Sequence, residues 1–227
     1  KHAKEKLRTI LKDSGHVLYS SAETLCQGGI YLLGHNPGGS PEGREDESIE
    51  NSLHNLAEKK TNEYLDDSWN GLAPGEAVLQ KRVRWLLEQL NMDVREVCAS
   101  NLIFSRSVDA KSSNFKDMAN LCWPVHEYIL RTVKPKMILA FGNSKESPFF
   151  FLQEKLGVND DKIIPPHGSG HGSGDDEWKC KAFCTPNGMV IVGLPHLSRY
   201  AIDHHEDVPR WIQTIFSDAV LNNNKNI

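Results

Sequence analysis

The stretch that decides the fold is Gly29-Ile30-Tyr31-Leu32-Leu33, which leads directly into Gly34-His35-Asn36-Pro37-Gly38-Gly39-Ser40. An apolar run with β-branched and aromatic residues, followed at once by a turn rich in Gly and Pro, is typical of a buried strand that ends in a loop at the edge of a sheet. The turn carries one carboxamide, Asn36, among small residues that let a ligand approach the backbone closely. We therefore predict that this loop forms one wall of a functional site.

Strands and helices alternate along the rest of the chain. Apolar runs predict further strands at 97–104, 137–141, 178–183 and 189–194. Helical periodicity predicts helices at 1–13, 117–132, 149–156 and 208–221, a further helix that opens at 73–75 and carries Val78 to Leu90 on its apolar face, and a weak one at about 49–65. This alternation predicts an α/β fold, in which a mainly parallel central sheet of about four strands is the middle layer of a three-layer αβα sandwich.

The totals fit one domain that spans residues 1–227, with an acidic excursion at about 40–68 and a Gly/His-rich loop at 165–176. The excursion reads either as a lid or as a solvated insertion. A formal net charge of -4 argues against non-specific coating of nucleic acid, but it allows a local basic groove. No apolar stretch approaches the roughly 20 residues that span a bilayer, so we expect no membrane partner. Five cysteines without dense spacing indicate a reducing, intracellular compartment, either nucleus or cytoplasm and nucleoid.

Three polar side chains occur where strands end: Asn36 after the first, Asn101 within the second and His196 after the last. Because ligands bind beyond the carboxyl ends of parallel strands, we expect the three to meet on one rim. Asn36 either orients a water molecule or caps its turn. Asn101 either presents a donor and an acceptor to a pyrimidine edge or serves a buried network. His196 either donates to a developing anion or bonds loop backbone.

The residues that follow His196 suit contact with DNA. Ser198 and nearby backbone N–H groups could hold a phosphate, and Arg199 could add positive charge there. Tyr200 is large enough to wedge into a base stack.

In combination these pieces resemble the uracil-DNA glycosylase superfamily. The first motif matches Gly34-His35-Asn36-Pro37-Gly38, the base-reading strand matches Ser100-Asn101-Leu102, and the second motif matches Leu194-Pro195-His196-Leu197-Ser198. The residues at 120–124 and 134–142 are similar to that superfamily's central helix and strand, and the resemblance covers roughly residues 28 to 215.

The resemblance implies an enzyme that flips a damaged base out of DNA and hydrolyses its N-glycosidic bond without metal or cofactor. Asn36, in a version of the motif similar to that of the mismatch-specific and single-strand-selective branches, would position the attacking water, and His196 would stabilise the departing base. The remaining implied roles are base reading by Asn101, a substrate-binding loop of Gly34, His35, Pro37 and Gly38, phosphate contacts from Ser40 and Ser198, and filling of the vacated stack by Tyr200 or Arg199. Trp69 is the candidate for stacking on the base, with a place in the core as the alternative. The expected partner is DNA that contains uracil or another damaged base, bound by a monomer.

The chain departs from the family pattern in two respects. His196-Leu197-Ser198-Arg199 stands where the family often has His-Pro-Ser-Pro, and no CxxC pair exists for the iron–sulfur cluster of one branch.

Two other functions are alternatives to the glycosylase. An Asn in place of an acid in the first motif favours a second hypothesis, a nucleic-acid-binding protein that does not catalyse. A third hypothesis is a zinc hydrolase built on His167, His171, Cys180 and Cys184, although their spacing is more typical of a Gly/His-rich loop beside reduced cysteines.

Overall fold

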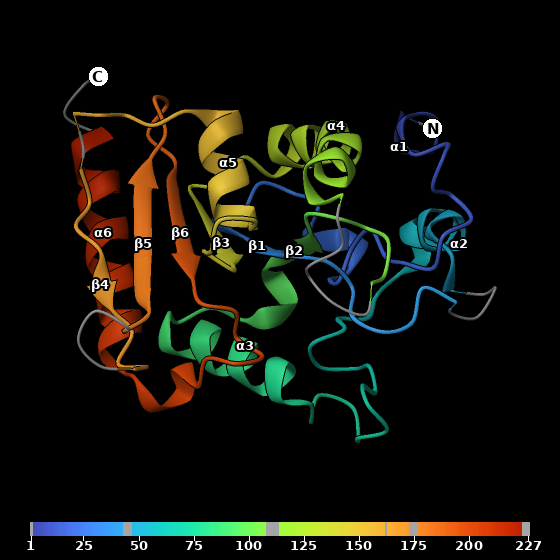
Figure 1. Ribbon diagram of the computed structural model, residues 1–227, viewed down its shortest axis with the longest axis horizontal. Coiled ribbons are helices and arrows are strands. Elements are labelled where there is room, and N and C mark those ends of the chain that lie inside the picture. The colour runs from blue at the N-terminus through green and yellow to red at the C-terminus, as the bar shows by residue number, and fades with distance from the viewer. Residues whose placement is uncertain (1, 43–46, 108–113, 162, 173–176, 224–227) are drawn as a thin grey trace.

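A six-stranded sheet organises the structure (Figure 1). The computed structural model describes residues 2–42, 47–107, 114–161, 163–172 and 177–223, the last six by backbone only. The strands lie in the order β2-β1-β3-β6-β5-β4. Their bounds are β1 (Ile30–Gly34), β2 (Cys98–Asn101), β3 (Met137–Phe141), β4 (His167–Gly168), β5 (Lys179–Cys184) and β6 (Val190–Leu194).

Four strands pair in parallel, and two are added at one edge. β2, β1, β3 and β6 form the parallel part, while β5 runs antiparallel to β6 and β4 antiparallel to β5. The prediction of a mainly parallel sheet is confirmed, but the estimate of about four strands is wrong. The Gly/His-rich segment at 165–176 was predicted to be loop throughout, yet His167 and Gly168 pair with Cys180 and Lys179. Residues 173–176 of that segment, and 43–46 of the acidic excursion, lie outside the described part.

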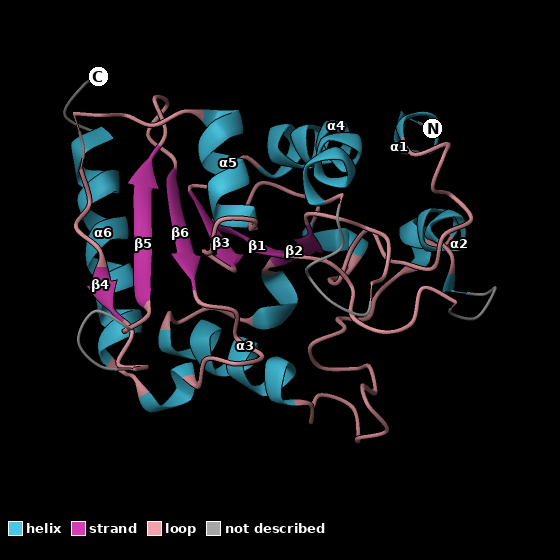
Figure 2. Ribbon diagram, in the orientation of Figure 1, coloured by secondary structure: helices cyan, strands magenta, loops and turns pink. Residues whose placement is uncertain are grey.

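Helices pack on both faces of the sheet (Figure 2). They are α1 (His2–Lys6), α2 (Ile49–His54), α3 (Val78–Gln89), α4 (Phe115–Val133), α5 (Pro148–Leu156) and α6 (Asp207–Asn223). Side chains of α4 and α5 pack with Tyr31 and Leu33 of β1, whereas those of α3 and α6 pack with Ile30 and Leu32. This alternation is what a strand buried on both faces requires, and it is consistent with the predicted αβα arrangement. No described helix is both long and apolar enough to cross a bilayer.

Three of the helix predictions need correction. The first helix ends at Lys6 and not at 13, because the following residues turn so that Leu7 and Ile10 enter the core. The weak helix expected over 49–65 ends at His54 and continues as a single 3₁₀ turn, Leu56–Glu58. Val78, expected on the apolar face of α3, is 53% exposed because it is the first residue of that helix.

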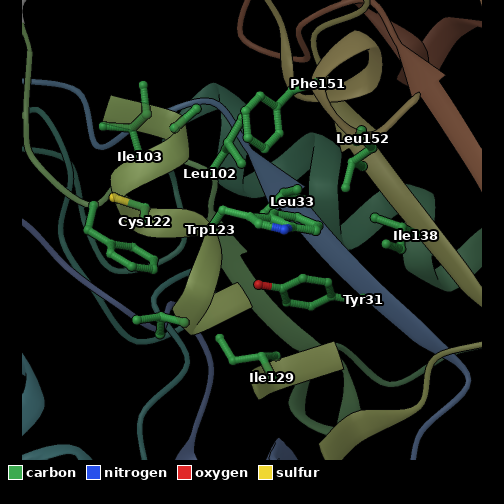
Figure 3. Close-up of a cluster of buried hydrophobic side chains, with 14 of the residues drawn as sticks. Tyr31, Leu33, Leu102, Ile103, Cys122, Trp123, Ile129, Ile138, Phe151 and Leu152 are labelled. Carbon is green, nitrogen blue, oxygen red and sulfur yellow. The ribbon is translucent and has the colours of Figure 1, made fainter. Parts of the chain in front are cut away.

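A buried histidine of α4, His126, is hydrogen-bonded to Tyr31 and Leu102, two members of the hydrophobic cluster that Figure 3 shows. His126 of α4 is fully buried, and burial lowers its pKa to about 4, so it is neutral at pH 7. Its Nε2–H donates to the carbonyl of Leu102 at 3.0 Å, which leaves Nδ1 to accept from the Tyr31 hydroxyl at 2.9 Å. These bonds join α4 to β1 and to the residue that follows β2.

The excursion is attached to the body of the domain by a ladder of single β-bridges. Four separate segments of the chain are linked by three bridges: Ser14 with Ser48, Gly15 with Ser105, and Gly38 with Ser107. Gly15 is required here, because a Cβ at that position would lie 2.0 Å from the carbonyl oxygen of Phe104. Ser48 of the excursion is therefore docked on the N-terminal segment, and the last bridge of the ladder lies at the loop that follows β1.

Candidate functional site

The structure brings Asn36, Asn101 and His196 to one edge of the sheet. Gly34, the last residue of β1, is the register partner of Asn101, the last residue of β2. Phe141 at the end of β3 pairs with Leu194 at the end of β6, two residues before His196. Since all four strands are parallel, their carboxyl ends lie at the same edge, which we call the rim. The loop 34–40 is called the first loop, and the loop 195–200 the second.

The carboxamide of Asn36 has a fixed orientation. Its Nδ2 donates to the carbonyl of Pro37 at 2.7 Å and to the Ser107 hydroxyl at 2.9 Å. Because an amide nitrogen has two N–H donors, both are used, and Oδ1 points away from these two acceptors. The Nδ2 end of the half-buried Asn36 therefore stabilises the turn, and its acceptor oxygen points away from that turn.

Asn101 lies against the backbone of Gly34. Its Oδ1 is 1.9 Å from the position that a Cβ on Gly34 would occupy, so any larger residue there would displace the amide. The side chain of Asn101 is hydrogen-bonded to the hydroxyl of Tyr19, whose own burial raises its pKa and keeps it protonated. Asn101 is only 6% exposed. This buried amide therefore has a network partner, as one of its two interpretations required, and it also faces the rim.

Trp69 belongs to an aromatic cluster on the same side of the sheet as Asn101. Its ring meets those of Tyr19 and Tyr64 edge-on, with centroids 6.0 and 5.7 Å apart, and its Nε1 donates to Asp67 at 2.7 Å. Trp69 is half-buried and packs against the core from the outside. It is thus placed next to the Tyr19 that bonds Asn101, and its role in stacking on a base stays a prediction.

His196 is held in one tautomer by its neighbour Ser198. Nδ1 lies 2.7 Å from the Ser198 hydroxyl and 3.3 Å from the Ser198 backbone nitrogen. A backbone N–H can only donate, so Nδ1 accepts and the proton of the neutral ring sits on Nε2. Burial, and then the charge of Arg199, lower the pKa of His196, which keeps the ring neutral at pH 7. Ser198 therefore orients the histidine, and its contact with a phosphate stays a prediction.

The other first-loop residues occupy different environments. His35 is buried on the opposite face of the sheet from Asn101, with its ring 4.9 Å from that of Phe115. Burial, and then His196, lower the pKa of His35 to about 4. Pro37 is buried, whereas Gly38 and Ser40 are exposed, and a Cβ on Gly38 would meet open space. The rim is accordingly open in front of Gly38.

Tyr200 cannot fill a base stack from the position it occupies. It is fully buried, and its hydroxyl donates to the carbonyl of Ser169 at 2.7 Å. The prediction of Tyr200 as a wedge is therefore corrected, because a side chain that anchors the second loop to the segment before β5 is not available to DNA. Arg199, the alternative for that role, is exposed.

The side chains of the zinc hypothesis have other partners. His167 bonds Asp207 at 2.8 Å and stacks on Trp211, while His171 packs on Trp178. Cys180 and Cys184 are buried, and burial raises the pKa of Cys180 to about 12. Within the described ranges, no three His, Cys, Asp or Glu side chains gather closely enough to hold a metal ion.

Four residues at or beside the rim were missed by sequence reasoning: Tyr19, Arg106, Ser107 and Phe115. Tyr19 ends the short apolar run Val17-Leu18-Tyr19, which was too brief to be assigned to an element. Arg106 and Ser107 lie just beyond the second strand, in a polar stretch with no periodic pattern. Arg106 donates to the carbonyl of Gly38 at 2.9 Å. Sequence patterns could not reveal Arg106 and Ser107, because their contacts depend on the bridges that join distant segments.

Comparison with known proteins adds no family assignment. The sequence matches no protein-family profile, and no curated protein is significantly similar to it.

Proposed function

We propose that this protein is a DNA glycosylase that hydrolyses the N-glycosidic bond of uracil, or a related damaged base, flipped out of DNA. The observation that carries the proposal is the Asn36 amide, whose two N–H donors are both bonded, so that its oxygen is the end that can accept from a water molecule. Asn101 and a neutral His196 lie on the same rim. The resemblance of the three motifs to the uracil-DNA glycosylase superfamily supports the same reaction.

In this proposal Asn36 orients water rather than deprotonating it. A carboxamide is not a useful general base, but its oxygen can accept one hydrogen bond and fix the direction of attack. Such a group suffices where the sugar is an oxocarbenium-like cation when the water arrives, because a strong nucleophile is then unnecessary. The water oxygen bonds to C1′ of the sugar, and the electron pair of the broken C–N bond leaves with the base. The proton that the water loses passes through solvent to the departed base anion.

His196 would stabilise that departing anion. Its Nε2–H is the donor, since Ser198 holds Nδ1 as the acceptor. A donor already aimed at developing negative charge lowers the barrier without reorganisation. A neutral ring fits this task, because the proton stays on the donor at pH 7.

Asn101 would read the pyrimidine edge, which offers an acceptor and a donor side by side. Its near-complete burial means that a base reaches the amide only if neighbouring side chains shift. Tyr19 lies beside Asn101, and Trp69 packs edge-on against Tyr19 on the same side of the sheet. If the flipped base entered between Tyr19 and Trp69, the ring of Trp69 would stack on it.

Contacts to the DNA backbone would come from exposed groups on the two loops. Arg199 supplies charge beside His196, and Ser40 lies at the end of the first loop. Such contacts position a strand without reading its sequence. The proposal places a monomeric protein in an intracellular compartment that contains DNA, and it requires neither metal nor cofactor.

The decisive experiment incubates the protein with oligonucleotides that carry uracil opposite G, opposite A or unpaired, and scores abasic sites after alkaline cleavage. We expect release from at least one of them, and loss of release with retained DNA binding for Asn36→Ala. If no uracil or other damaged base is released from any oligonucleotide, the glycosylase proposal is wrong.

The second candidate is a nucleic-acid-binding protein of the same fold that does not catalyse. The observation that favours it is an amide at the position where an acid would activate water strongly. Tight binding of the uracil oligonucleotides without release, and without an effect of Asn36→Ala, is the result that would identify it.

A further inference from the structure

We infer that Arg106 is a positioning residue that holds the first loop, and with it Asn36, in the geometry that water attack requires. The inference rests on the proposed function for its kinetic consequences. Its structural content, a clasp on the backbone of the first loop, stands on contacts of this chain and can be tested without any enzymatic activity.

The guanidinium of Arg106 contacts four residues in three other segments. Nη1 donates to the carbonyl of Gly38 at 2.9 Å, and Nε donates to the Ser14 hydroxyl at 3.1 Å. Nη2 reaches His16 Nε2 at 3.1 Å and the Glu47 carboxylate at 3.2 Å. The aliphatic stem passes Gly39, which has a φ of +107°. A single side chain therefore ties the first loop to the N-terminal segment and to the excursion.

The backbone around Arg106 reinforces this connection. Its own N–H donates to the carbonyl of Ser14 at 2.8 Å, and the N–H of Ser107 donates to the carbonyl of Pro37 at 3.2 Å. The Ser107 hydroxyl is one of the two acceptors for the amide of Asn36. Movement of Arg106 would thus pull on the carbonyl of Gly38 and on the acceptor of Asn36 at the same time.

The state of His16 matches this arrangement. Burial lowers its pKa, so the ring is neutral at pH 7 and its Nε2 can accept from the guanidinium, which only donates. Nδ1 then carries the proton and lies 3.4 Å from Glu63. A guanidinium is the only side chain with enough donors in fixed directions to serve these partners together.

A cavity of about 280 Å³ lies between the N-terminal segment and the excursion. His16 and Glu47, two of the four partners of Arg106, line it together with Ser48 and Lys59. Glu47 of the excursion is therefore linked to the first loop through Arg106.

The test compares Arg106→Gln and Arg106→Lys with the matched control Arg95→Gln. Arg95 is an exposed arginine that pairs with Asp66 through two hydrogen bonds, far along the chain from both loops. We expect the single-turnover rate of base release to fall about 10²-fold in both Arg106 variants, because a displacement of about 1 Å at a reacting group costs that much. DNA affinity should change less than twofold, and the control should be unchanged. Glu47→Gln removes the charge of one of the four partners. This variant should fold normally, and its rate of base release should fall only a few-fold.

A double variant separates positioning from a general loss of structure. If Arg106 acts through Asn36, then Arg106→Gln should slow the residual reaction of Asn36→Ala by less than twofold. Losses that multiply in the double variant, or a wild-type rate in Arg106→Gln, would overturn the inference.

Hydrogen exchange tests the clasp independently of catalysis. Amide exchange in residues 34–40 should accelerate at least tenfold in Arg106→Gln and stay unchanged in Arg95→Gln. Unchanged exchange in the first loop would overturn the clasp even if the enzyme is active. Failure of the wild-type protein to release any base would instead overturn the proposed function and leave the exchange result standing.

Discussion

The two loops of the rim carry their key side chains in similar positions but are built in different ways. The hydrogen bonds that orient His196 lie within the second loop: the carbonyl of His196 accepts from the N–H groups of Arg199 and Tyr200, and Ser198 holds the ring. The first loop takes its support from elsewhere, since Asn36 depends on Ser107 and the carbonyl of Gly38 on Arg106. A locally built loop tolerates changes far away in the chain, whereas a loop held by distant segments transmits them to its functional group.

The largest effect we expect is on the second loop itself. His196→Ala should lower the rate of base release about 10²- to 10³-fold, as loss of a donor to a developing anion does. The rate is measured in single-turnover release from the best uracil oligonucleotide, and the exposed His204→Ala serves as the control. A loss smaller than that in Arg106→Gln would mean that the anion is stabilised by another group.

Acid should destabilise the side of the molecule that holds the first loop. The pKa values of His35 and His126 are about 4, below the usual 6.5, so the unfolded chain binds these two protons first as the pH falls. Stability should be constant above about pH 6.5 and fall between pH 6.5 and 4, by up to about 3 kcal/mol for each histidine. Urea unfolding at pH 7 and pH 4.5 measures the loss, and His126→Phe should lose less between the two pH values than the wild-type chain.

An added methyl group at the end of β1 should disturb Asn101. Gly34→Ala places a Cβ 1.9 Å from the present position of Asn101 Oδ1, so the amide must move. Overpacking of this kind costs about 1–3 kcal/mol of stability. Preference for uracil over cytosine in release assays should fall together with the midpoint of thermal unfolding. Retention of both would show that Asn101 has room to move and does not read the base edge.

The smallest effect should come from the arginine that touches the second loop. Arg82 of α3 donates to the carbonyl of Leu197 at 2.7 Å and to Asp203 at 3.3 Å. Because the second loop is supported by its own hydrogen bonds, Arg82→Gln should cost about 1 kcal/mol, or roughly fivefold in rate. The rates of Arg82→Gln and Arg106→Gln are compared in the same assay. A larger loss in Arg82→Gln would reverse the contrast between the two loops.

The same contrast explains which parts of the molecule the sequence could reveal. Strand ends are local signals, so the rim that holds Asn36, Asn101 and His196 was predicted from runs of apolar residues followed by polar ones. The Ser198–His196 contact spans two residues and belongs to the same local pattern. The predicted strands at 178–183 and 189–194 form a hairpin in the structure, which is why the sheet is wider than its parallel part.

Tertiary contacts decide the features of the site that sequence patterns could not reveal. Tyr200 reads as an exposed wedge in the sequence, but the segment before β5 covers it. No pattern near Arg106 shows that it will meet Ser14, His16, Gly38 and Glu47, because those contacts depend on where four segments cross. The burial of His126 is equally invisible, since its partners Tyr31 and Leu102 are distant in the chain.

The ladder of single bridges has a consequence for the order of folding. Each rung, including the last one between Gly38 and Ser107, closes a long loop for little contact area. Contacts of this kind are acquired after the locally paired elements. We therefore expect the first loop to reach its final shape late, after the sheet and the second loop are in place. A partly folded full-length chain would then expose a rim with His196 oriented and Asn36 still unconstrained.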